Sequence, residues 1–260
     1  MRAHLRHCAG AARLHPPDAA GEHPAGRGAV SLRERDAHVL ELMDDPDCDP
    51  RRLEATLRRF NTVNRLWSGW AGVYRSRLGP FLGSLGRPAR VLDLGSGGGD
   101  LVVRLARLAK RDGLDVTWLG VDPDPRAHAV AAGRASSGIA FRCADAATLV
   151  SEGAAFDAVV SNHVLHHLDA DGLRAFAAES LALADGLALH SDIRRDRLAY
   201  GLYAVGVTPF APGTFLRTDG LRSIRRSYLP AELEAALGAP WRVDPAAPFR
   251  VVATARVSHA

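Results

Sequence analysis

The chain has 260 residues, 47% of them hydrophobic and 24% charged, and its formal net charge is +4. This length and apolar content predict one soluble domain with a sizeable core. No apolar run approaches the ~18 residues of a membrane helix, and the basic excess is scattered arginine, so we expect neither a membrane span nor a nucleic-acid partner.

Residues 1–42 are expected to be a disordered leader. The beginning of the chain is rich in His, Arg, Ala, Pro and Gly, without apolar periodicity and without the continuous apolar core of a secretory signal. The three cysteines, Cys8, Cys48 and Cys143, have neither metal nor disulfide spacing. We therefore expect a reducing, cytoplasmic location and no metal site.

The segment 43–86 is predicted to be helical. Leu53, Leu57, Phe60, Val63 and Trp67 recur at three- and four-residue steps, which is the spacing of one helix face.

A glycine-rich loop follows the first predicted strand, at VLDLGSGGGD (residues 91–100). The apolar run ends in the acid Asp93, and Gly95, Gly97 and Gly99 allow a tight turn before the next helix. A dinucleotide fingerprint needs a further glycine at its sixth position, and the chain has Asp100 or Val102 there. The phosphate-binding loop ending in Gly-Lys-Ser/Thr is absent too.

This strand, acid and glycine run resembles the first motif of the class I S-adenosylmethionine-dependent methyltransferases. The resemblance implies an α/β fold with a Rossmann-like seven-stranded, mostly parallel sheet. It also implies that the loop contacts the methionine part of the cofactor and that Asp93 orders the loop and the cofactor's amino group. The cofactor residues expected in this region are Asp93, Gly95, Ser96, Gly97 and Gly99.

Asp122 ends the second predicted strand, in VTWLGVDPDP (residues 116–125). A carboxylate just past a parallel strand can accept hydrogen bonds from both hydroxyls of a ribose. We therefore expect Asp122, with the adjacent Pro123, to bind the cofactor's ribose. The alternative role, capping the helix that begins at Pro125, suits Asp124 better.

Asp145 follows the third predicted strand, in IAFRCADAATL (residues 139–149). The resemblance implies that Asp145 accepts a hydrogen bond from the exocyclic amine of adenine and that Ala144 offers its backbone amide to the ring. The alternative for Asp145 is an N-terminal cap of the next helix.

The fourth predicted strand leads into a histidine-rich segment, FDAVVSNHVLHHL (residues 156–168). The Asn/Asp-Pro-Pro-aromatic run of enzymes that methylate nucleic-acid bases is absent here. Asn162 is expected at the cofactor. His163 and His166 are the candidate general bases, because histidine can take up a proton near neutral pH. Their alternative role is capping or hydrogen bonding around the site.

The remaining segments are assigned to the acceptor. The resemblance implies that the helices of 43–86 form a lid over the cofactor, that 87–260 form the catalytic domain, and that an insertion near 198–228 shapes substrate specificity. A closing antiparallel hairpin is expected at Trp241–Asp244 and Phe249–Val257. Helix packing is the alternative for the aromatic members of the substrate-wall set. The substrate-wall candidates are six aromatic side chains, one arginine and one asparagine: Asn64, Arg65, Trp67, Trp70, Tyr74, Tyr200, Tyr203 and Phe210.

These features predict transfer of a methyl group from S-adenosylmethionine to a small hydrophobic acceptor, of a phenolic or polyketide type, with O-methylation favoured over C-methylation. The run from MDDPDCDP through NRLWSGW resembles small actinobacterial methyltransferases associated with polyketide pathways. Two alternatives stay open: a nicotinamide-dependent oxidoreductase, and a non-catalytic protein that binds S-adenosylmethionine beside a partner. The sequence does not indicate an oligomeric state.

Overall fold

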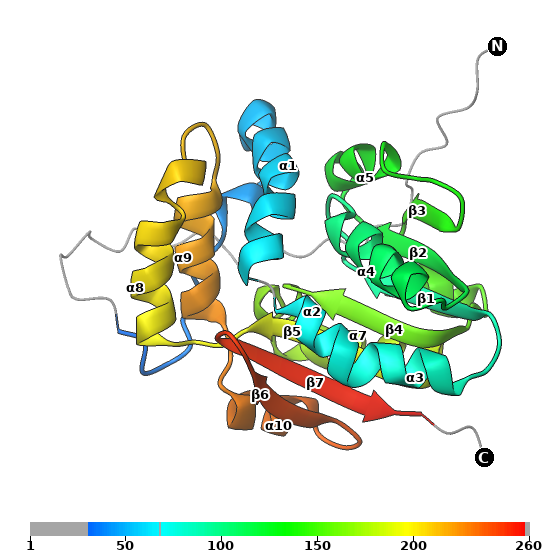
Figure 1. Cartoon of the computed structure of the whole chain (residues 1–260). Helices are drawn as coiled ribbons and strands as arrows, with labels where there is room; N and C mark the ends of the chain where they lie inside the picture. The colour runs from blue at the N-terminus through cyan, green and yellow to red at the C-terminus, as the bar shows by residue number, and fades with distance from the viewer. Residues whose placement is uncertain (1–30, 68, 258–260) are drawn as a thin grey trace, which may run out of the picture.

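The computed structural model describes residues 31–67 and 69–257, apart from the side chains of residues 60, 61 and 63–67. Its centre is a seven-stranded sheet with strand order β3-β2-β1-β4-β5-β7-β6 (Figure 1). Strands β1 to β5 run parallel, whereas β7 is antiparallel to both β5 and β6. The predicted Rossmann-like, mostly parallel sheet with a C-terminal antiparallel hairpin is confirmed.

The parallel strands alternate with helices along the chain, because a parallel pair needs a crossover connection. The strands are β1 (Ala89–Leu94), β2 (Val116–Asp122), β3 (Ile139–Cys143), β4 (Phe156–Asn162), β5 (Ala184–Ile193), β6 (Arg242–Ala246) and β7 (Arg250–Arg256). Helices α4 (Asp100–Arg111), α5 (Pro125–Ala132), α6 (Ala146–Ser151), η3 (Leu165–His167) and α7 (Ala170–Leu183) connect β1 to β5.

The other helices lie before β1 and after β5. The N-terminal ones are η1 (Leu42–Asp44), α1 (Pro50–Trp67), α2 (Trp70–Val73), η2 (Tyr74–Leu78) and α3 (Gly79–Ser84). The insertion after β5 consists of α8 (Arg197–Gly206), η4 (Thr208–Phe210) and α9 (Leu216–Arg226), and α10 (Pro230–Leu237) precedes the hairpin. Within the described residues, no helix combines the length and apolar character needed to cross a membrane.

Two apolar cores cover the two faces of the sheet. Alternate residues of a strand point to opposite faces, and in β4 Val159 belongs to one core while Ala158 and Val160 belong to the other. The first core includes side chains of α6, α7 and α10, and the second includes side chains of α2, η2, α3 and α4. Burial on both faces explains the continuous apolar runs of the parallel strands.

Helix α1 and the insertion lie on the same side of the sheet, and α8 and α9 stand side by side there (Figure 1). The backbone amide of Phe215 donates to Thr56 Oγ1 of α1 at 2.9 Å, and Arg52 donates to the Thr214 carbonyl at 3.0 Å. These bonds join α1 to the loop before α9, although the two segments are far apart in the chain.

The sequence places residues 31–42 in the expected disordered leader. Residues 1–30 lie outside the described part of the chain, but residues 31–42 pack against η3 and α9 rather than forming a disordered tail. Arg35 donates to the carbonyls of His166, Leu168 and Arg226, and the Leu42 amide donates to Asp219 at 2.8 Å. Polar contacts hold this segment in place, so the hydropathy of its sequence gives no sign that it packs against the domain.

Candidate active site

The glycine loop after β1 has the backbone that the sequence predicted. Gly95, Gly97 and Gly99 have φ values of 70°, 52° and 80°, in the left-handed region that favours glycine. A Cβ at Gly95 would lie 2.6 Å from Val164 Cγ2, and one at Gly99 would lie 2.6 Å from the Phe141 ring. The loop is therefore in close contact with β3 and with the segment that follows β4, and these two positions need glycine.

Asp93 carries a buried carboxyl group beside this loop. Its exposed fraction is 1%, and neither carboxylate oxygen has a hydrogen-bond partner among the described residues. Burial raises its pKa well above the usual value, and the negative charges of Asp100 and Asp122 raise it further. An unsatisfied buried carboxyl is costly, so this position suits a bound cation that donates hydrogen bonds. The amino group of S-adenosylmethionine fits that description.

Asp122 links β2 to the glycine loop. Its Oδ2 accepts from the Gly97 amide at 2.8 Å, and its Oδ1 accepts from the Asp124 amide at 2.9 Å. Each carboxylate oxygen can accept more than one hydrogen bond, so these contacts leave capacity for ribose hydroxyls. Asp124 caps α5 by accepting from the Arg126 amide, as expected. The ribose contact itself stays a prediction.

Asp145 caps α6, which is the alternative role weighed for it. Its Oδ1 accepts from the amide of Thr148 at 2.9 Å and from the Thr148 hydroxyl. The Ala144 amide donates to the Asp122 carbonyl at 3.2 Å, which continues the pairing of β2 and β3 by one residue. In this structure that amide is thus engaged within the sheet. The adenine contacts of both residues stay predictions.

His163 and Asn162 are held by a buried arginine from β7. Arg250, which is 2% exposed, lies with Nη1 2.8 Å from His163 Nε2 and donates from Nη2 to Asn162 Oδ1 at 2.6 Å. Arginine can only donate, so His163 Nε2 is an acceptor and the proton of the neutral ring sits on Nδ1. Burial lowers the pKa of His163 well below its usual value, and the charge of Arg250 lowers it further.

His166 lies between two acids. Its Nδ1 is 2.7 Å from Asp192 Oδ1, at the end of β5, and its Nε2 is 3.3 Å from Glu41 Oε1. The His166 amide also donates to Asp192 Oδ2 at 2.9 Å. Burial alone would lower the pKa of His166, but the charge and hydrogen bond of Asp192, with those of Glu41, raise it to about 9. His166 is therefore an imidazolium near neutral pH when only these acids contact it.

Glu41 is 4% exposed and accepts from the Ser223 hydroxyl at 2.6 Å. Burial alone would raise its pKa, but the charge of His167, the hydrogen bond and charge of His166 and the hydrogen bond of Ser223 lower it to about 2. Sequence analysis assigned no role to Glu41, Asp192 or Arg250. Asp192 carried a usable signal, since it stands near the end of a parallel strand like Asp93 and Asp122. Glu41 and Arg250 carried none.

The substrate-wall candidates fall into three groups. Trp70 and Tyr74 are fully buried in the core with α3 and α4. They therefore pack between helices and sheet, which is the alternative weighed for them, and do not face a cleft. Tyr203 and Phe210 pack against Val207 and Leu216 within the insertion, and the Tyr203 hydroxyl donates to the Leu216 carbonyl at 2.8 Å. Tyr200 is half-buried on α8. The side chains of Asn64, Arg65 and Trp67 lie outside the described residues.

Comparison with known proteins identifies the part of the chain that holds the glycine loop with Asp93, Asp122 and Asp145. Residues 91–185 match the family described as "Methyltransferase domain". A ubiquinone biosynthesis O-methyltransferase of Azorhizobium caulinodans is 33% identical over 156 residues, which are 58% of this chain and 57% of that protein. The protein of the same name from Brucella ovis is 31% identical over 153 residues, 56% of this chain and 57% of that protein. The chain thus spans little more than half the length of these relatives.

Solved structures agree on the fold. The plantazolicin methyltransferase BpumL, in complex with SAH, has a TM-score of 0.59 at 14% identity and covers 84% of this chain and 93% of its own. A second BpumL structure, with a monoazolic desmethylPZN analog and SAH, has a TM-score of 0.54 and covers 78% and 85%. These structures support the Rossmann-like fold, and residues 91–185 of the chain match the methyltransferase domain family.

Proposed function

We propose that this chain transfers the methyl group of S-adenosylmethionine to an oxygen atom of a small hydrophobic acceptor of phenolic or polyketide type. The observation that carries the proposal is the buried, unpartnered carboxyl of Asp93 beside the glycine loop, within the segment that matches the methyltransferase family. The relatives' names specify O-methylation, which favours oxygen over carbon as the acceptor atom. The aromatic side chains of the insertion favour an apolar acceptor.

The residues of the cofactor side would bind and orient the methyl donor. When bound, S-adenosylmethionine supplies an electrophilic methyl group, because that group is attached to a sulfonium. Asp93 would hold the amino group, Asp122 the ribose and Asp145 the adenine amine. Proximity and orientation can supply about 7 to 11 kcal/mol of catalysis in favourable cases, so alignment of the acceptor is the main task of the protein.

His166 is the stronger of the two candidates for handling the acceptor's proton. Asp192 orients it, as a carboxylate orients the histidine in other acid–base pairs. His163 would first have to leave Arg250, because Nε2 already accepts from that side chain. His166 would first have to release its own proton, because its pKa is raised to about 9. Contact with an acceptor that separates His166 from Glu41 would favour that release.

A methyl-transfer assay tests the proposal. The purified chain is incubated with methyl-labelled S-adenosylmethionine and extracts of the source organism, and the labelled products are identified by mass spectrometry. We expect label on an aromatic hydroxyl. Cofactor binding without transfer would support the non-catalytic alternative, and binding of NADH without S-adenosylmethionine would support the oxidoreductase alternative.

Replacing both histidines tests the proton-handling role. We expect His163→Gln with His166→Gln to reduce turnover at least tenfold and to change cofactor affinity much less, because neither side chain is assigned to the cofactor. Unchanged turnover would rule the role out. Calorimetric titration with the cofactor supplies the affinity.

Two expectations about context accompany the proposal. The three cysteines without disulfide spacing support a cytoplasmic location. The missing base-gripping motif after β4 supports a small-molecule acceptor and not a nucleic acid.

A further inference from the structure

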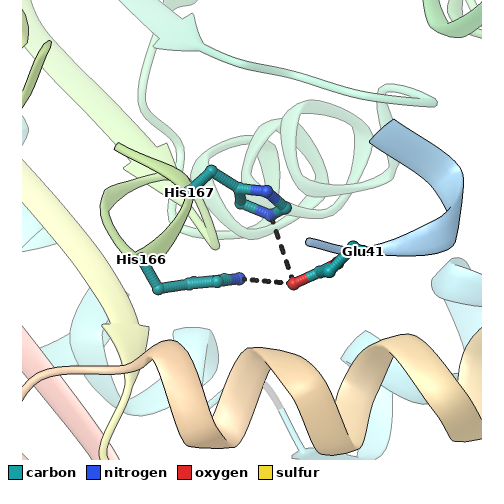
Figure 2. Close-up of side chains that lie close together, drawn as sticks. All are labelled: Glu41, His166 and His167. Carbon is teal, nitrogen blue, oxygen red and sulfur yellow. Dashed lines mark ion pairs between the residues drawn. The ribbon is translucent and has the colours of Figure 1, made fainter. Parts of the chain in front are cut away.

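Three potential ligand atoms converge beside η3. Glu41 Oε1 lies 3.3 Å from His166 Nε2 and 3.7 Å from His167 Nε2 (Figure 2). The three ligand atoms all lie within 4.8 Å of one another. Glu41 comes from the segment before η1, and the histidines come from η3, so the chain brings one carboxylate and two imidazoles to a single point.

The spacing of these atoms suits a tetrahedral ion. Zinc binds imidazole nitrogen and carboxylate oxygen at roughly 2.0 to 2.2 Å, so two ligands at a tetrahedral angle lie about 3.4 Å apart. The two distances to Glu41 Oε1 lie close to that value on either side. The ligand atoms of His166 and His167 lie within 4.8 Å of each other, so the two rings would approach each other when an ion binds.

Both histidines carry the outer contact that metal-binding histidines usually have. A ligating imidazole generally donates its other N–H to a carboxylate or carbonyl, which fixes the ring and its tautomer. His166 Nδ1 is 2.7 Å from Asp192 Oδ1, and His167 Nδ1 is 3.1 Å from Asp44 Oδ2. Each ring is therefore held by an acid at Nδ1 and directs Nε2 toward Glu41.

His166 Nε2 provides an independent indication. His166 is 1% exposed, and its Nε2 has no well-aligned hydrogen bond among the described residues, although it lies 3.3 Å from Glu41. This ring nitrogen is directed at the carboxylate oxygen that would share the ion (Figure 2). The Ser223 hydroxyl, which donates to Glu41 Oε1 at 2.6 Å, holds the carboxylate in place.

We propose that Glu41, His166 and His167 form a binding site for a divalent transition-metal cation, with zinc as the best match. Two imidazoles and one carboxylate favour zinc, cobalt or nickel over magnesium and calcium, which prefer oxygen ligands. Three protein ligands leave a fourth position for an oxygen donor, as in zinc enzymes.

The location gives the site a role in the proposed reaction. Val164, two residues before His166, contacts the position where Gly95 would carry a Cβ, so η3 adjoins the cofactor loop. An acceptor hydroxyl bound at the fourth position would lose its proton to solvent more readily, because the cation stabilises the oxyanion; with the cation bound, His166 would act as its ligand and not as the proton acceptor. This role rests on the proposed function, whereas the binding of the cation does not.

The test is metal binding by the full chain after treatment with a chelator. Zinc chloride is added in a calorimeter, and cobalt chloride is added with detection of visible absorption, which is intense for tetrahedral cobalt. We expect one ion per chain and a tetrahedral cobalt spectrum. Absence of zinc binding at micromolar concentrations, or a spectrum of octahedral cobalt, would overturn the proposal.

Variants locate the ion. His167→Ala and Glu41→Gln should each weaken zinc binding at least tenfold and abolish the cobalt spectrum, since each removes one of three ligands. His38→Ala, an exposed position on the same N-terminal segment, is the matched control and should bind zinc as the unaltered chain does. Binding that survives both ligand variants would place the ion elsewhere, for example at the histidines and Cys8 of residues 1–30, and would refute the site.

Two further measurements keep these outcomes separate from other failures. Circular dichroism of each variant identifies any variant that has not folded. If Glu41→Gln does not fold, His167→Ala still tests the site, because the His167 side chain is 28% exposed and its replacement disturbs the core less. Zinc binding without methyl transfer to any acceptor would count against the proposed function and leave the metal site intact. Methyl transfer that is unaffected by complete metal removal would refute the role in deprotonation but not the binding of the cation.

Discussion

The proposed cofactor side and the proposed acceptor side of the candidate site are built differently. The proposed cofactor residues Asp93, Asp122 and Asp145 come from one continuous segment and stand at or just past the ends of three neighbouring parallel strands. The acceptor side joins Glu41, His166, Asp192 and Arg250 from four separate segments through buried polar contacts. The first arrangement follows from the topology of the sheet, and the second depends on tertiary packing.

Arg250 tests whether the acceptor side is an independent unit. Arg250→Met would leave the acceptor atoms of Asn162, His163 and Ser191 without their donor. We expect the free energy of unfolding to fall by about 3 kcal/mol or more, because unsatisfied buried polar groups cost roughly 1 to 3 kcal/mol each. Urea unfolding measures this change.

Arg256→Met, at an exposed position of the same strand, is the control and should cost less than about 1 kcal/mol. Cofactor affinity per folded molecule should fall only modestly in Arg250→Met, because Arg250 contacts Asn162 among the predicted cofactor residues but does not contact Asp93, Asp122 or Asp145. A large loss of affinity in that variant would show that the two sides are coupled and would break the comparison.

The pH dependence of cofactor binding tests the cofactor side. Burial raises the pKa of Asp93 well above its usual value, and a bound cation would lower it again. Binding should therefore release a proton, and affinity should rise with pH, by at most about tenfold per pH unit, until the raised pKa is passed. Calorimetry in buffers of different ionisation enthalpy counts the protons. No release at any pH below that pKa would contradict the role of Asp93.

Asp145 tests how far one residue combines two roles. Asp145→Ala should lower the free energy of unfolding by about 1 kcal/mol, because the cap of α6 is lost. Asp145→Asn should retain most of the cap, since asparagine also accepts from the helix amides. If Asp145 also binds adenine, both variants should weaken cofactor binding, the alanine variant more strongly. A loss of stability with unchanged cofactor affinity would show that Asp145 only caps α6 and would contradict the adenine contact.

The same contrast explains what the sequence could predict. Acids at the ends of parallel strands meet at one edge of the sheet, so local patterns mark the positions of Asp93, Asp122 and Asp145, while their cofactor roles stay predictions. Glu41 and Arg250 lie far along the chain from the histidines they contact, and no local pattern marks them. The local pattern of Trp70 and Tyr74 could not distinguish a substrate wall from a core, because an apolar helix face has the same periodicity in both. The Asp192 carboxylate followed the strand-end pattern and was predictable in retrospect.

The central claim is that Asp93 holds the methyl donor beside the glycine loop, and a calorimetric titration with S-adenosylmethionine tests it most directly. The unaltered chain should bind one molecule, and Asp93→Asn should bind it about 10- to 100-fold more weakly, since a hydrogen bond to a charged group contributes roughly 1.5 to 3 kcal/mol. Asp171→Asn makes the same change at a side chain that is 89% exposed and should bind like the unaltered chain. Equal affinity of the Asp93→Asn variant and the unaltered chain would contradict the account.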